Sequence, residues 1–274
     1  MMNNMPISND ILQYHNAWLN LPIEYVIANW NKKLYHILPY KYFLDILKNH
    51  SLYFVNIFQS WWDEPYELFY YRPNYFSQVN GKSVHIDVKN LAMNFYAQCW
   101  SENRDSDAMW RIYSGKNYDG VRIATTLGEI IKLLYPITNM NQFPNIGFMR
   151  YEWKKDIKQW LANHSSITFL NWREAAMESL FMKRKNFNHE KEFRIIFSVP
   201  TIQDNGMPNV VQDHLSIPID INTFIKEITF SPFIDSNKYG KHYRNITRYL
   251  NGNIPVNQSY LYTDDISNKT ITLL

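Results

Sequence analysis

The sequence is poor in cysteine and glycine, and it contains no long apolar run. Cys99 is the one cysteine in 274 residues, so an internal disulfide is impossible, and no cluster of ligands around it indicates a structural zinc site. The 8 glycines form no phosphate-binding pattern, which argues against a Rossmann or P-loop enzyme. No apolar stretch approaches the roughly 18 residues of a membrane span, and the N-terminus lacks the pattern of a secretory signal. These absences favour a cytoplasmic protein with no membrane partner.

Charged residues are also few, at 19%, whereas aromatic residues make up 16% of the chain. A chain this rich in aromatic residues has ample material for a core and is not typical of disordered proteins. The 28 basic and 25 acidic residues give a net charge of +3. This mildly basic balance permits contact with a polyanion without requiring it.

Short strands and helices follow one another without a strict βαβ rhythm, which favours an α+β fold. We expect a helical N-terminal extension over residues 1–30 and a single domain over residues 31–274. That domain would contain a mixed or antiparallel central sheet flanked by helices. The expected strands are residues 34–38, 52–56, 95–100, 121–126, 190–199, 225–231, 254–257 and 260–262; the expected helices are residues 40–49, 107–114, 127–134, 150–167, 172–181 and 239–250, with residues 136–149 irregular.

The clearest strand, residues 190–199, carries charged residues at alternate positions. Glu190, Glu192 and Arg194 would therefore share one face. Two carboxylates beside a guanidinium suit a reactive site, because the cation keeps one acid ionised while mutual repulsion raises the pKa of the other. The alternative is the exposed polar face of an edge strand. The preceding basic run, residues 183–185, is usually a solvated face but can also meet a phosphate.

Three further segments combine aromatic and polar side chains. Tyr35 and His36 lie in a short strand, where the imidazole can hydrogen-bond a ligand or be satisfied by the backbone. Trp61 and Trp62 adjoin Asp63 and Glu64; they can stack on a base or sugar ring, or they can fill a core while Asp63 caps a helix.

The third segment runs from Cys99 and Ser101 to a short helix. Trp110 and Tyr113 are three residues apart on that helix, so they can wall a pocket for a planar ring or belong to the core. Cys99 has no basic neighbour in sequence, and we expect an inert buried thiol. The eight histidines are scattered without ligand spacing, so no metal is expected.

The order of these segments resembles the DUF2971 family. The segments that match are LYHILPYKYFLDILKNHSLYFVN, WWDEPYE, CWSENRDSDAMWRIYSGKNYDGVRIAT and FNHEKEFRIIF, so the resemblance covers about residues 33–198. The sequence departs from the family's usual Asn-Asp-Pro at Pro65, where Trp-Asp-Glu precedes the proline.

The sequence also resembles ADP-ribosyltransferase-like enzymes more remotely. That resemblance implies an ADP-ribosyltransferase-like fold and NAD as a substrate. It implies that His36 contacts the ribose, that Tyr113 or Trp110 stacks on the nicotinamide and that Glu192 is the catalytic acid. Cleavage of an N-glycosidic bond generates an oxocarbenium-like sugar, which a nearby carboxylate stabilises. Substrate-binding candidates are Tyr35, Trp62, Asp63, Ser101, Trp110, Tyr113 and Arg194; the catalytic candidates are Glu192, Glu190 and His36.

Three functions remain open at this point. The first is NAD-dependent ADP-ribosyl transfer to a macromolecule, in a toxin or a phage-defence effector. The second is a DNA or RNA N-glycosylase that stacks a flipped base among the aromatic residues. The third is a non-catalytic module that binds a nucleotide or nucleic acid. The basic residues that would hold phosphates are Lys183, Arg184, Lys185, Arg194, Lys238, Lys241, Arg244 and Arg248.

Overall fold

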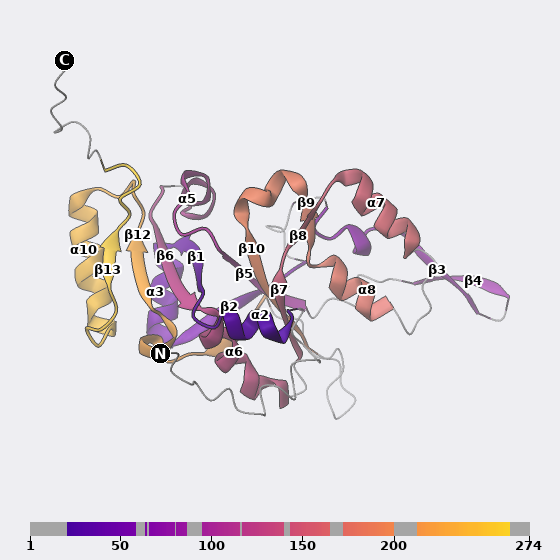
Figure 1. The fold of residues 1–274 in the computed structure, drawn as a ribbon, viewed down its shortest axis with the longest axis horizontal. Helices are drawn as coiled ribbons and strands as arrows, with labels where there is room; N and C mark the ends of the chain where they lie inside the picture. Colours follow the sequence, from indigo (N-terminus) through magenta and orange to yellow (C-terminus); the bar gives the residue numbers. More distant parts are fainter. Residues whose placement is uncertain are drawn as a thin grey trace, which may run out of the picture. The chain divides into compact units, whose positions relative to one another are not determined.

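A computed structural model divides the chain into two compact units. Figure 1 labels its helices and strands. The structure describes residues 21–58, 64, 66–79, 81–86, 95–115, 117–139, 143–164, 172–199 and 213–263. The first unit contains residues 1–32, 52–102 and 127–217, and the second contains residues 33–51, 103–126 and 218–274. The expected division at residue 30 stays a prediction.

The first unit is built on antiparallel pairings around β10. Its larger sheet contains β2 (Ser51–Asn56), β5 (Phe95–Ser101), β7 (Phe143–Phe148), β10 (Glu192–Ser198) and β11 (His214–Pro218). β10 pairs with β5 on one side and with β7 on the other, while β2 joins β5 to β11. β10 is therefore an internal strand, and six of its seven residues are buried. The alternative of an exposed edge strand is wrong.

Two smaller pairs of strands complete the β-structure of this unit. β3 (Tyr75–Val79) and β4 (Lys82–Ile86) form an antiparallel hairpin, and β8 (Arg150–Glu152) pairs in parallel with β9 (Met182–Arg184). The helices are α2 (Ile23–Ala28), α6 (Leu127–Leu134), α7 (Lys154–Asn163) and α8 (Trp172–Ser179), with the 3₁₀ turns η1 (Phe69–Tyr71), η2 (Tyr135–Asn139) and η3 (Lys185–Glu190).

Close packing at α6 explains one of the few glycines. A Cβ at Gly128 would overlap the ring of Trp30, so no larger residue fits there without rearrangement. The Gly128 N–H also donates to the Trp30 carbonyl at 2.9 Å. The start of α6 thus depends on a residue without a side chain.

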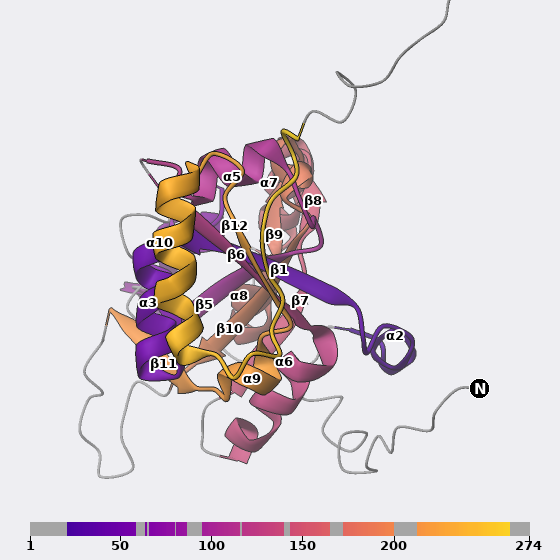
Figure 2. The ribbon, with the colours of Figure 1, turned by 90° about the vertical axis from the view of Figure 1, so that its left-hand side faces the viewer.

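The second unit has a sheet with the order β1-β6-β12-β13. Its strands are β1 (Lys33–Pro39), β6 (Gly120–Thr126), β12 (Glu227–Phe230) and β13 (Val256–Gln258), and its helices are α3 (Tyr40–Asn49), α5 (Asp107–Tyr113), α9 (Ile221–Phe224) and α10 (Ser236–Ile246), followed by the 3₁₀ turn η4 (Thr247–Tyr249). The first three strands are antiparallel, whereas β13 is parallel to β12. Figure 2 shows α10 alongside α3, where His242 stacks on Tyr40 at 3.5 Å between ring centroids.

The α+β class with a mixed sheet is confirmed, and most expected elements are present within a few residues. Three expectations are wrong. The helix expected at residues 150–167 begins only at Lys154, because the preceding residues pair with β9. The irregular stretch contains β7, whose Pro144 and Gly147 are untypical of strands. The strand expected at residues 260–262 is a turn.

None of the helices in the described ranges has the length and apolar character that crossing a membrane requires.

Candidate functional site

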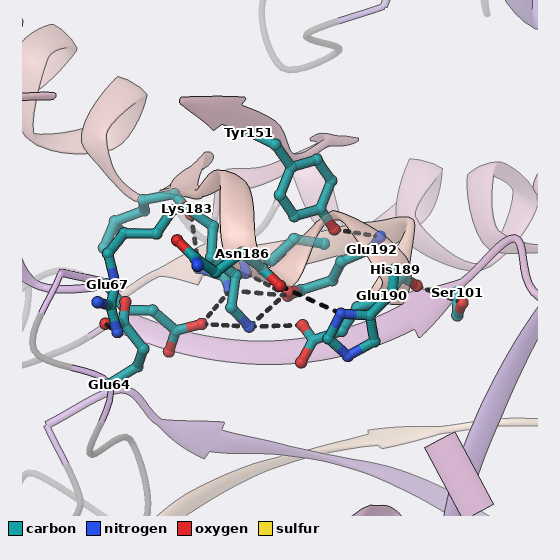
Figure 3. Close-up of polar contacts among 12 residues, drawn as sticks. Glu64, Glu67, Ser101, Tyr151, Lys183, Asn186, His189, Glu190 and Glu192 are labelled. Atoms are coloured by element: carbon teal, nitrogen blue, oxygen red, sulfur yellow. Dashed lines mark hydrogen bonds and ion pairs between the residues drawn. The ribbon is translucent and has the colours of Figure 1, made fainter. Parts of the chain in front are cut away.

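Five charged side chains of the first unit form a buried ion cluster, which comprises Glu67, Lys183, Glu190, Glu192 and Arg194. Figure 3 labels the first four of them. The Lys183 ammonium lies 2.6 Å from Glu190, 2.7 Å from Glu67 and 3.3 Å from Glu192. The Arg194 guanidinium lies 2.7 Å from Glu192 and 3.2 Å from Glu67. Each cation therefore bridges at least two carboxylates, and the cluster forms one network.

Four separate segments bring these residues together. Glu192 and Arg194 are two residues apart on β10 and share a face, as the sequence predicts. Lys183 comes from β9, and Glu67 precedes η1. Glu190 is not on the strand, which corrects the expectation: it ends η3, and Lys191 then adopts a left-handed conformation at φ 41°. That turn lets Glu190 and Glu192 both reach Lys183.

Charge and burial together fix the ionisation of Glu192. Its exposed fraction is 5%, and that of Arg194 is 1%. Burial alone would raise the pKa of Glu192, but Arg194 and Lys183 outweigh it and lower the pKa to about 2. Burial would lower the pKa of Lys183 and of Arg194, yet the surrounding carboxylates raise both. Glu192 is therefore a charged carboxylate at neutral pH in a largely dry environment.

Arg194 also links the Glu192 carboxylate to a backbone carbonyl through two hydrogen bonds. Its Nε donates to Glu192 Oε1 at 2.8 Å, and its Nη1 donates to the carbonyl of Leu180 at 2.6 Å. Tyr151, which the sequence did not single out, accepts a hydrogen bond from the Glu192 N–H at 2.8 Å. Ser101 donates to the carbonyl of Glu190 at 2.5 Å, so this candidate positions the cluster through the main chain.

Cys99 lies opposite Arg194 in the β5–β10 ladder. Burial raises the pKa of its thiol well above the usual range, and the charge of Glu192 adds to this, while Arg194 opposes it. A thiol in this state stays protonated at neutral pH and is a poor nucleophile. The structure thus supports the expectation of an inert cysteine.

A less buried rim adjoins the cluster at Arg184. Arg184 forms a 2.7 Å ion pair with Glu64, and its guanidinium carbon lies 5.1 Å from the Tyr66 ring centroid and 5.4 Å from that of Phe187. Lys185 is exposed, but Lys183 is buried inside the cluster and not on a solvated face. A phosphate-binding role for residues 183–185 stays a prediction. Trp62 and Asp63 lie outside the described residues.

The other candidates belong to the second unit. Trp110 is completely buried, packs with Ile37, and donates from Nε1 to Asp105 at 2.5 Å. It therefore belongs to the core and does not wall an open pocket. Tyr113 is 36% exposed. Tyr35 lies over the Arg122 guanidinium at 5.2 Å.

His36 is half-buried, and alternation along β1 directs it to the face opposite Ile37 and Trp110. The contact of His36 with the ribose stays a prediction.

Within the described ranges, no group of three or more His, Cys, Asp or Glu residues is arranged to hold a metal ion.

Comparison with known proteins finds a partial family match. The model of DUF2971, a family of proteins of unknown function, matches residues 109–195 and so confirms the expected resemblance there. The match includes Arg194, Glu192 and Glu190, but the resemblances expected before residue 109 lie outside it. No curated protein matches the chain.

The fold has low similarity to several solved structures. Thermus sp. 2.9 DarT in complex with NAD+ is similar at 12% identity and a TM-score of 0.35, over 84% of this chain and 96% of the other. DarT from the same source in complex with ADP-ribosylated ssDNA is similar at 10% identity and a TM-score of 0.35, over 82% and 94%.

Proposed function

We propose that the protein transfers ADP-ribose from NAD to a macromolecule, with Glu192 as the carboxylate beside the reacting sugar carbon. The observation that carries this proposal is the state of Glu192. It is held ionised with a pKa of about 2 by Arg194 and Lys183, on an internal strand. A carboxylate fixed in this way stabilises a developing positive charge with little reorganisation.

The proposed reaction breaks the bond between ribose C1′ and the nicotinamide nitrogen. Both bonding electrons leave with the nitrogen, which becomes neutral, and the ribose acquires oxocarbenium-like positive charge near Glu192. An oxygen or nitrogen atom of the acceptor then donates an electron pair to C1′ and loses its proton. The products are nicotinamide, the ADP-ribosylated acceptor and one proton.

The low pKa of Glu192 assigns different roles to Glu192 and Glu190 in the proposed reaction. A group with a pKa of about 2 is a weak proton acceptor, so Glu192 acts by electrostatic stabilisation and by orienting a ribose hydroxyl. Glu190 reaches the same Lys183 ammonium and is the candidate that accepts the acceptor's proton. Contacts of His36 with the ribose, and of Tyr113 with the nicotinamide, belong to the same proposal.

Substrate access requires movement around the cluster, because Glu192 is only 5% exposed. The segment that carries Glu64 and Glu67 is joined to β9 and β10 by ion pairs with Arg184, Lys183 and Arg194. Release of these pairs would uncover the carboxylates. The same burial favours a second candidate function, in which the cluster is structural and the protein binds nucleotides without turnover.

The test is incubation of the wild type with NAD and with plain and modified DNA, followed by mass spectrometry. Matched variants are Glu192→Gln, Glu190→Gln and, as a surface control on α6, Lys132→Gln. The proposal predicts release of nicotinamide and a covalent adduct on an acceptor. Removal of an electrostatic stabiliser should reduce this rate by about a hundredfold or more. Each variant is checked for a retained thermal transition.

Two outcomes would contradict the proposal. A free nucleobase with NAD intact would identify an N-glycosylase. Binding of NAD or nucleic acid without any product, unchanged in folded Glu192→Gln, would identify the non-catalytic module.

A further inference from the structure

A cavity of about 360 Å³ lies in the first unit between α7 and the segment entering β3. Tyr75, Phe76, Lys158 and Leu161 are among its lining residues. Phe76 is 64% exposed, whereas the Tyr75 hydroxyl donates to the carbonyl of Tyr70 at 2.7 Å, which holds that ring in place. The cavity thus offers aromatic surface with the Lys158 ammonium at its wall.

Two lysines follow one side of α7 toward this cavity. Lys154 and Lys158 are exposed and are four residues apart, so they lie one turn from each other on the same face of the helix. Asp156, between them in sequence, is rotated by about 200° from Lys154 and points to the other side. The face beside the cavity is therefore basic.

The same side of the unit continues to the rim of the ion cluster. The Lys154 ammonium lies 5.4 Å from the Tyr66 ring centroid, and the Arg184 guanidinium lies 5.1 Å from the same centroid. The register of β8 and β9 places Glu152, two residues before α7, opposite Arg184. Three cations and two aromatic rings therefore follow one another along a basic aromatic track, defined by Arg184, Tyr66, Lys154, Lys158 and Phe76.

We propose that this track binds a single-stranded nucleic acid, with phosphates at Lys154 and Lys158 and a base stacked on Phe76 in the cavity. Neighbouring cations and aromatic rings suit a single strand, because its bases expose their faces for stacking while its phosphates follow the basic residues. A duplex hides those faces. Arg184, at one end of the track, follows Lys183, and Lys183 is paired with Glu192 in the ion cluster. A nucleic-acid strand bound along the track would therefore end near Glu192.

This inference names the acceptor of the proposed transfer and in that respect rests on the proposed function. Binding itself needs neither NAD nor turnover, so the two can be tested separately. If the protein cleaves NAD but its affinity for the oligonucleotide is unchanged in the track variants, only the proposed binding site would be overturned. If the track variants weaken oligonucleotide binding but the protein does not cleave NAD, only the proposed transfer would be overturned.

The experiment is fluorescence anisotropy of a labelled oligothymidylate with the full-length protein at several salt concentrations. Phe76→Ala should weaken binding by about fivefold to a hundredfold, the usual effect of losing one stacked base. The double variant Lys154→Gln/Lys158→Gln should reduce the slope of log K against log salt by about 1.4, because each phosphate contact contributes about 0.7. Lys41→Gln/Lys48→Gln, at two exposed lysines of α3, removes the same two charges as a control and should leave both quantities unchanged.

Competition separates base recognition from simple charge attraction. Unlabelled oligothymidylate should displace the probe much better than polyglutamate or a duplex of equal length. Equal displacement by polyglutamate would refute base stacking, and equal displacement by the duplex would refute the preference for a single strand. Unchanged affinity in both track variants, with their folds retained, would overturn the inference.

Discussion

Replacement of Glu192 by glutamine should destabilise the fold by an amount that depends on pH. Lowering the pKa of this carboxyl from 4.5 to about 2 corresponds to about 3 kcal/mol of folding free energy at neutral pH. Because the folded-state pKa is depressed, this stabilisation is complete above the unfolded-state pKa. It is lost as pH falls through about 4.5 toward 2.

The assay is urea denaturation of the wild type and Glu192→Gln at pH 7, 5, 4 and 3. The difference in unfolding free energy between them should shrink by about 2 kcal/mol from pH 7 to pH 3, because glutamine does not titrate. Arg194→Met and the double variant complete a cycle that isolates the coupling of the pair. A difference that stays constant across this range, or one below about 0.5 kcal/mol at pH 7, would refute the assignment of a strongly stabilised carboxylate.

Three further results should follow from the packing and charges. Gly128→Ala should destabilise the fold by about 1–3 kcal/mol in thermal unfolding, since its Cβ would overlap the ring of Trp30. Lys183→Met should cost about 3–5 kcal/mol in denaturant unfolding because it leaves buried carboxylates without their shared cation, whereas exposed Lys185→Met should change stability by less than about 0.5 kcal/mol. Cys99 should resist a thiol reagent at pH 7 in the native state and react on unfolding; rapid native labelling would contradict its raised pKa.

Local patterns predicted most of the framework. The alternation in residues 190–199 correctly identified a strand and placed Glu192 and Arg194 on one face. Strand periodicity alone does not give the neighbours of a strand, so it left the edge alternative open. β7, which pairs with the second edge of β10, is an example. Its Pro144 and Gly147 are untypical of strands, so the sequence pattern did not predict it.

The ion cluster could be predicted only in part, because its members are held together by tertiary packing. The sequence placed Glu190 and Glu192 near each other, although a left-handed Lys191 and not the strand achieves this. Glu67 lies more than a hundred residues away from its partner Arg194, and no local pattern reports that contact. The available signal was the group of acids, Glu67 among them, within a run rich in aromatic residues.

Release of nicotinamide from NAD, measured in parallel for the wild type and Glu192→Gln, tests the proposed chemistry most directly. The account predicts release by the wild type together with an ADP-ribosylated acceptor. It predicts a loss of about a hundredfold in a variant that still shows a cooperative thermal transition. Equal release by the two proteins, or none by the wild type with a range of acceptors, would contradict the role of Glu192 in cleavage of the glycosidic bond.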